Sequence, residues 1–71
     1  MMRKLPGVVN LSPEEGKFLK DMIEHHKMAL VMAKDVLRTT NDYDVMSLAY
    51  SIMQTQTNEI ALMQEMLRYR N

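Results

Sequence analysis

Thr39-Thr40-Asn41-Asp42 interrupts a sequence that is otherwise rich in helix formers. The side chains of these four residues compete for backbone hydrogen bonds, so they favour turns and helix caps over helix interiors. The sequence therefore predicts two helices, over about residues 13–38 and 43–69. Because the link between them is short, we expect an all-α fold in which the helices are antiparallel neighbours, a long αα-hairpin.

The outer end of the first predicted helix carries a start signal, Ser12-Pro13-Glu14-Glu15. Ser12 can cap the helix, Pro13 lies where a missing N–H costs nothing, and Glu15 completes a capping box. Asn41 or Asp42 is expected to cap the second helix. Residues 1–11 show no periodicity and include a proline and a glycine, so they are predicted to form a flexible arm before a hairpin over residues 12–71.

The composition limits the possible functions. The chain has 71 residues with nine methionines, no cysteine and a net charge of zero. Without cysteine there are no disulfides, thiolate zinc sites, iron–sulfur clusters or thiol nucleophiles. The zero charge argues against a nucleic-acid or anionic-membrane partner. No apolar run approaches the roughly 20 residues of a membrane span, and none resembles a signal peptide, so the sequence as written predicts a cytoplasmic protein.

Each predicted helix carries an apolar arc that is wider than one partner helix can cover. At 100° per residue, apolar side chains on each helix form one stripe with further apolar residues on both flanks. The two stripes consist of Phe18, Leu19, Met22, Ala29, Ala33, Val36 and Leu37 on the first helix and of Val45, Leu48, Ala49, Ile52, Met63, Met66 and Leu67 on the second. We therefore predict that two hairpins associate as a homodimeric four-helix bundle.

Four polar residues, His25, His26, Gln56 and Glu59, lie within these apolar stripes. If the chain turns near Asn41, residues whose numbers sum to about 82 lie side by side. The two histidines are then level with Gln56 and Glu59. An unsatisfied buried polar group costs roughly 1–3 kcal/mol, so something must satisfy this layer.

The polar layer has three interpretations. It can be a hydrogen-bonded network that only fixes register and oligomeric state. It can instead bind copper(I) or silver(I), because Met22 can converge with His25 and His26 on one ion, and Met63 can approach from the second helix or from the other protomer. A zinc or nickel site made of the two histidines and Glu59 is the third interpretation.

The remaining patterns favour a protein that is not an enzyme. The Glu-x-x-His pairs of di-iron bundles and the His-Glu-x-x-His motif of zinc proteases are both absent, and no phosphate-binding glycine loop occurs. Methionine at helical spacing commonly fills cores, and we interpret Met28, Met32, Met46 and Met53 primarily as packing residues.

Residues 22–33, Met-Ile-Glu-His-His-Lys-Met-Ala-Leu-Val-Met-Ala, resemble the Met-Ile-x-His-His-x-x-Ala-x-x-Met-Ala signature of the CopM-like family. This is a ferritin-like domain of unknown function, number 305. The second helix continues the similarity with Leu48-Ala49, Ile52, Gln56, Glu59-Ile60 and Met63. The resemblance covers roughly residues 18 to 66.

The resemblance implies a ferritin-like four-helix bundle that binds copper and silver through methionine and histidine. Carried over by position, the implied ligands are Met22, His25, His26 and Met63, with Met32 as a further candidate. Family members usually carry the motif twice in one chain and are often exported. This sequence carries it once, which implies a half-length member that restores the bundle by dimerising.

Overall fold

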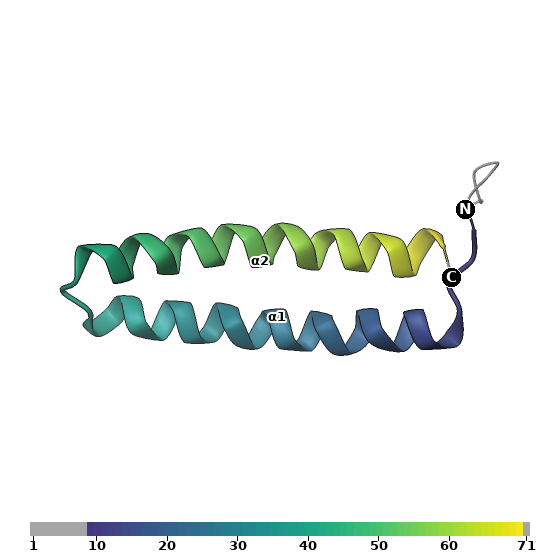
Figure 1. Cartoon of the computed structure of the whole chain (residues 1–71), viewed down its shortest axis with the longest axis horizontal. Helices are drawn as coiled ribbons and strands as arrows, with labels where there is room; N and C mark the ends of the chain where they lie inside the picture. Colours follow the sequence, from purple (N-terminus) through teal and green to yellow (C-terminus); the bar gives the residue numbers. More distant parts are fainter. Residues whose placement is uncertain (1–8, 71) are drawn as a thin grey trace.

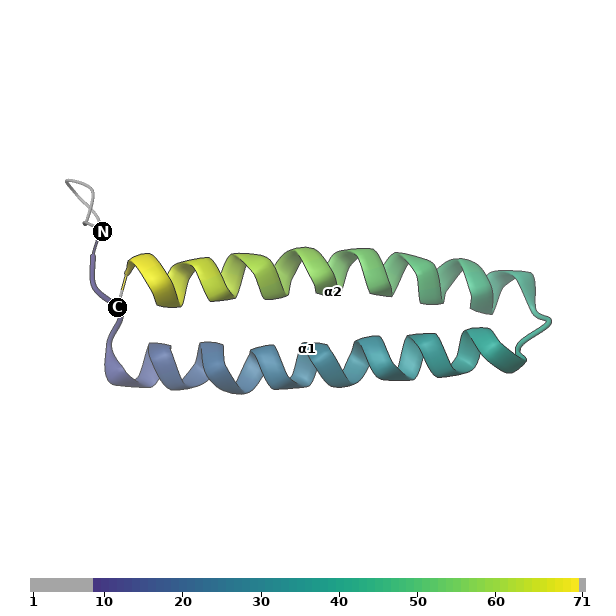
Figure 2. The same ribbon diagram turned by 180° about the vertical axis from the view of Figure 1, so that it is seen from behind.

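The computed structural model describes residues 9–70, and these form two long helices joined by a tight turn. Helix α1 spans Pro13–Thr39 and helix α2 spans Tyr43–Tyr69. The helices lie antiparallel and contact each other along their whole length (Figures 1 and 2). The predicted all-α hairpin is confirmed, and α1 ends one residue beyond the predicted Arg38.

The caps on both helices are built from side chains. The Ser12 hydroxyl accepts a hydrogen bond from the Glu15 backbone N–H at 3.1 Å, and the Glu15 carboxylate accepts one from the Ser12 N–H at 2.7 Å, completing the predicted capping box. Asp42 caps α2 through a 2.9 Å bond from the Val45 N–H. These caps satisfy backbone donors that no preceding helical turn can reach.

The open end of the hairpin is closed by a contact between the two ends of the described chain. The Leu11 N–H donates to the Arg70 carbonyl at 2.9 Å, and Arg70 Nε donates to the Val9 carbonyl at 3.1 Å. Most of the predicted flexible arm, residues 1–8, lies outside the described residues. In residues 9–70, neither helix is long and apolar enough to cross a membrane.

The hydrophobic core within one chain is thin. Four buried side chains, Leu19, Ile23, Ile60 and Met63, form its main cluster, and Ala33 and Ala49 are buried nearer the turn. None of the described side chains is fully buried. A chain of this size depends on more than such a core for stability, because a single small core supplies only a few kcal/mol.

Candidate functional site

The two helices meet along one row of side chains on each, which we call the inner row. Its members follow the alternating spacing of three and four residues that keeps one side of a helix turned to its neighbour. The inner row consists of Leu19, Ile23, His26, Leu30, Ala33 and Leu37 on α1 and of Met46, Ala49, Met53, Gln56, Ile60, Met63 and Leu67 on α2. Every member of the inner row is buried or partly buried.

A second row with the same spacing begins one residue earlier on each helix, and we call it the outer row. In an antiparallel pair, a step of one residue back rotates both helices toward the same side of the hairpin, so the outer rows share one face. The outer row consists of Phe18, Met22, His25, Ala29, Met32 and Val36 on α1 and of Val45, Leu48, Ile52, Thr55, Glu59, Leu62 and Met66 on α2. Its members are exposed or only partly buried although most are apolar.

The outer row is hollowed by an apolar groove near the turn. The groove runs between the helices and is lined by Ala29, Met32, Ala33, Val36, Val45, Leu48, Ala49 and Ile52. A second hollow at the open end is lined by Leu11, Glu15, Phe18, Leu19, Met66 and Arg70. The outer row therefore forms a long apolar face with hollows toward both ends.

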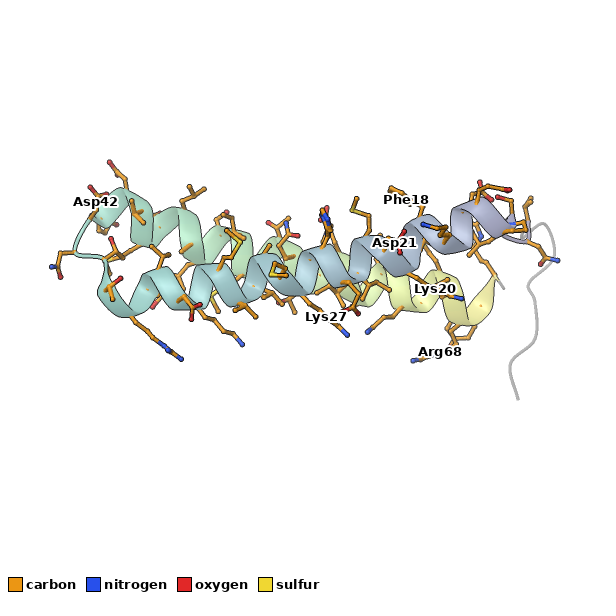
Figure 3. All side chains as sticks on the ribbon, turned by 90° about the horizontal axis from the view of Figure 1, so that it is seen from below. Phe18, Lys20, Asp21, Lys27, Asp42 and Arg68 are labelled. Atoms are coloured by element: carbon orange, nitrogen blue, oxygen red, sulfur yellow. The ribbon has the colours of Figure 1, made fainter. Side chains whose placement is uncertain are left out.

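The opposite face of the hairpin is polar and charged. Phe18 projects from one side of the hairpin, whereas Lys27 and Arg68 project from the other (Figure 3). Lys20, Lys34 and Arg38 of α1 are exposed on the same side as Lys27 by their helical spacing. One face is therefore solvated, and the apolar face opposite it has no partner within the described chain.

The predicted polar layer crosses both rows. His26 lies in the inner row, and its Nε2 is 2.7 Å from Oε1 of Glu59 on the outer row of α2. This contact confirms the predicted register, in which the histidines are level with Gln56 and Glu59. Gln56 is partly buried in the inner row, whereas His25 is exposed in the outer row.

The contact with Glu59 has a consequence for the His26 imidazole. A carboxylate oxygen accepts hydrogen bonds, so Nε2 carries the proton that joins the two groups, and in a neutral ring Nδ1 keeps the lone pair. Metal-binding histidines typically donate their second ring N–H to a carboxylate in this way. The His26 side chain is 17% exposed and that of Glu59 is 51% exposed, so the imidazole is sheltered while the carboxylate faces solvent.

The candidate methionines have different environments. Met63 is buried in the core cluster with 8% exposure, and Met22 packs against that cluster from the outer row. Met32 is exposed and lines the apolar groove. It is seven residues from His25, about 10.5 Å along the helix axis. The structure thus places Met22 and Met63 in the core cluster on the open-end side of the histidine layer and leaves Met32 in the groove on the turn side.

Among the described residues of one chain, a single pair of potential metal ligands with imidazole or carboxylate groups is in contact. This pair is His26 and Glu59. No group of three or more histidine, cysteine, aspartate or glutamate side chains suited to a metal ion forms within residues 9–70. Further donor groups are the imidazole of His25, which is the neighbouring residue, and the thioethers of Met22 and Met63 in the adjoining core cluster. The donor types suit a soft metal ion, since thioether sulfur selects copper(I) and imidazole also binds copper.

The sequence pattern predicts equivalent roles for the two histidines, whereas in the structure their surroundings differ. His26 is held between the helices and His25 is not. The sequence places the two histidines in different rows, one beginning at Leu19 and one at Phe18, but because both rows have the same spacing it does not show which row faces the second helix.

Comparison with known proteins places the chain in a family. Residues 7–70 match the family model described as "Domain of unknown function (DUF305)". The chain is also similar to Uncharacterized protein L153 of Acanthamoeba polyphaga mimivirus, with 37% identity over 57 residues, which are 80% of this chain and 38% of that protein. The chain thus spans well under half the length of this relative, and no solved structure matches it. The chain belongs to the DUF305 family.

Proposed function

We propose that this protein binds a soft metal ion, copper(I) or silver(I), for sequestration or homeostasis, and that it does so as a homodimeric four-helix bundle. The metal donors in this proposal are Met22, His25, His26 and Met63, with Met32 as a further candidate. The observation that carries the proposal is the His26–Glu59 contact of 2.7 Å, which joins the inner and outer rows near the middle of the hairpin. It holds a sheltered imidazole by a carboxylate, the arrangement in which metal-binding histidines are commonly oriented.

Dimerisation is supported by the shape and chemistry of the outer row. A helix of 27 residues is about 40 Å long, and the hairpin is about 20 Å wide. One face is therefore of the order of 800 Å², about the area that each partner contributes to a standard interface. Exposed apolar patches of this size mark interaction sites. A second copy of the chain offers the same apolar face and thereby completes a four-helix bundle.

The proposed metal function is tested by a competition titration with a copper(I) chelator. We expect the parent protein to bind copper(I) with sub-micromolar affinity, and we expect the double variant His25→Ala, His26→Ala to lose this binding. Met28→Leu is a matched control for Met22→Leu, because Met28 is an exposed methionine of α1 outside both rows. Met22→Leu should weaken copper(I) binding and Met28→Leu should not. Unchanged affinity in the double histidine variant would show that the donor assignment is wrong.

A structural oligomerisation module is the second candidate function. One observation favours it: His26, the sheltered histidine of the layer, is already bonded to Glu59, and the described residues contain no buried side-chain nitrogen or oxygen without a hydrogen-bond partner. Such a module would fix register and oligomeric state through the His/Gln/Glu layer. It predicts that copper(I) leaves the melting temperature unchanged, whereas a ligand that binds only the native state raises it.

Zinc or nickel binding through His25, His26 and Glu59 makes a different prediction. In that case Met22→Leu leaves affinity unchanged and Glu59→Gln weakens it, because the carboxylate is then a ligand and the thioether is not. Titrating both variants with zinc and with copper(I) separates the two metal classes.

A further inference from the structure

The polar layer lies at the midpoint of the hairpin. Helices α1 and α2 each contain 27 residues, so their middle residues are His26 and Gln56. His25 is one residue from the middle of α1, and Glu59 is three residues, or about 4.5 Å, from the middle of α2. The layer therefore divides the outer row into two halves of similar length.

The outer row is apolar on both sides of this layer. Toward the open end it presents Phe18, Met22, Leu62 and Met66, and toward the turn it presents Ala29, Met32, Val36, Val45, Leu48 and Ile52. Its polar members, His25, Thr55 and Glu59, are confined to the central turns. From the open end to the turn, the face formed by the outer row is thus apolar, then polar, then apolar again.

Two-fold symmetry constrains how two such faces can pack. In a closed dimer the same patch lies on both sides of the interface. The two-fold axis that brings two faces together lies in the plane of the interface, either along the hairpin or across it. With an axis along the hairpin, each residue lies opposite residues at the same height in the second copy. With an axis across the middle of the hairpin, the central residues of one copy lie opposite the central residues of the other. A displaced packing would bury His25 and the Oε2 atom of Glu59, which His26 does not contact, against apolar side chains that offer them no hydrogen-bond partner.

We infer that the metal site is shared between two copies of the chain, with His25, Met22 and Glu59 of each copy meeting in one central layer of the dimer. The inference rests on the proposed function and adds to it the source of the missing donors. One chain supplies no group of three carboxylate or imidazole side chains within its described residues. Two copies of this layer supply two His25 imidazoles, two Met22 thioethers and two Glu59 carboxylates, which is enough to surround an ion without cysteine.

A shared site couples metal binding to association. If dimerisation increases copper(I) affinity by some factor, copper(I) must increase dimer affinity by the same factor. Such coupling factors are typically between about 5-fold and 150-fold. If all donors of the site come from one chain, dimerisation does not change copper(I) affinity, and this coupling factor is one.

The test uses a variant that keeps every proposed donor but prevents association. Leu48 is 61% exposed in the outer row and lies eight residues, about 12 Å, from Gln56. Leu48→Glu places a charge in the dimer interface. Val31→Glu is the matched control, because Val31 is 54% exposed and lies on the solvated face of α1. Copper(I) affinity is measured for both by chelator competition, with helicity followed by circular dichroism and mass by sedimentation.

We expect a monomeric, helical Leu48→Glu chain to bind copper(I) at least about fivefold more weakly than the parent, and we expect Val31→Glu to match the parent. Equal affinity in the helical monomer would overturn the shared site while leaving the proposed metal function intact. Absence of copper(I) binding in the parent would instead contradict the proposed function itself.

A second measurement covers the case in which Leu48→Glu does not fold. The dimer dissociation constant of the parent is measured by sedimentation of dilute protein, with and without copper(I). A shared site lowers this constant by about 5-fold to 150-fold in the presence of the metal. A parent that binds copper(I) without any change in its dimer dissociation constant would show that each chain holds its own site.

Discussion

At the scale of single residues, the adjacent histidines have different surroundings. His26 is sheltered between the helices and bonded to Glu59, whereas His25 faces the open side of the hairpin. The difference follows from helix geometry, because neighbouring residues point about 100° apart. Glu59 is the residue that links the inner and outer rows.

The Glu59 carboxylate gives a prediction about stability. Glu59→Ala removes the acceptor of the His26 Nε2–H and should lower the free energy of unfolding by about 1 kcal/mol. Glu59→Gln should cost less, because its amide oxygen can still accept this hydrogen bond. Urea unfolding of the metal-free protein measures both changes.

The matched control for these substitutions is Glu65→Ala, which truncates an exposed glutamate further along α2. We expect its effect to lie within about 0.5 kcal/mol of zero. Equal losses in Glu59→Ala and Glu65→Ala would show that the His26–Glu59 contact does not contribute to stability.

At the scale of elements, the start of helix α1 is the feature whose structure the sequence specifies most directly. The capping box between Ser12 and Glu15 forms as predicted. Gly16 follows it, and its N–H donates to the Ser12 carbonyl at 2.9 Å. The start of α1 can therefore be altered without touching the polar layer.

Gly16→Ala is expected to stabilise the protein. A Cβ added at Gly16 would meet no heavy atom within 4 Å, and the residue is helical. Alanine reduces the entropy of the unfolded chain, so the free energy of unfolding should rise by roughly 0.4–1 kcal/mol. Thermal unfolding measures the change, and a clear loss of stability would show that the space beside Gly16 is occupied in the folded protein.

The capping box also predicts how stability depends on pH. Hydrogen bonds from the Ser12 backbone and side chain, followed by the charge of Arg70, lower the pKa of Glu15 below its ordinary value of 4.5. A carboxyl with a lower pKa in the folded state stabilises that state above its unfolded pKa. This contribution is lost as the pH falls through the lower, folded value.

Glu15→Gln isolates this effect, because glutamine keeps the capping geometry but has no charge. We expect the parent to be more stable than the variant at neutral pH, and the difference to shrink well below the ordinary glutamate pKa. Unfolding by urea at several pH values measures it. A difference that does not change with pH would mean that the Glu15 charge has no part in the cap.

At the scale of the whole molecule, a single hairpin leaves one apolar face without a partner in the described chain. The inner row accounts for all six side chains that are buried among residues 9–70, and the outer row remains exposed or half-buried. The solvated face opposite it is rich in lysine and arginine. This asymmetry favours association through the outer row.

Association through the outer row predicts a dimer whose stability depends on concentration. Because only the folded dimer buries the outer row, its melting temperature should rise with protein concentration. Sedimentation should give twice the mass of one chain, and Leu48→Glu should reduce it while Val31→Glu should not. A monodisperse monomer whose melting temperature is independent of concentration would contradict the four-helix bundle.

The sequence by itself determined the helices, the cap of α1 and the level of the polar layer, whereas the structure selected Asp42 over Asn41 as the cap of α2. Capping residues, the Thr39–Asp42 break and the spacing of apolar residues are local signals, and a short link between long helices fixes their register. From these signals it follows that the two histidines are level with Gln56 and Glu59, whereas the pairing of His26 with Glu59 comes from the structure.

Only the tertiary structure decided which side of each apolar arc is covered within the chain. The predicted stripes had their centres between the inner and outer rows, so Leu48 and Phe18 were placed in them together with Ala49 and Leu19. The position of the second helix covers one row and leaves the other open. Periodicity defines the width of an apolar arc but not the direction from which a partner approaches it. That direction holds His26 between the helices, leaves His25 exposed, and buries Met63 while Met32 stays in the groove.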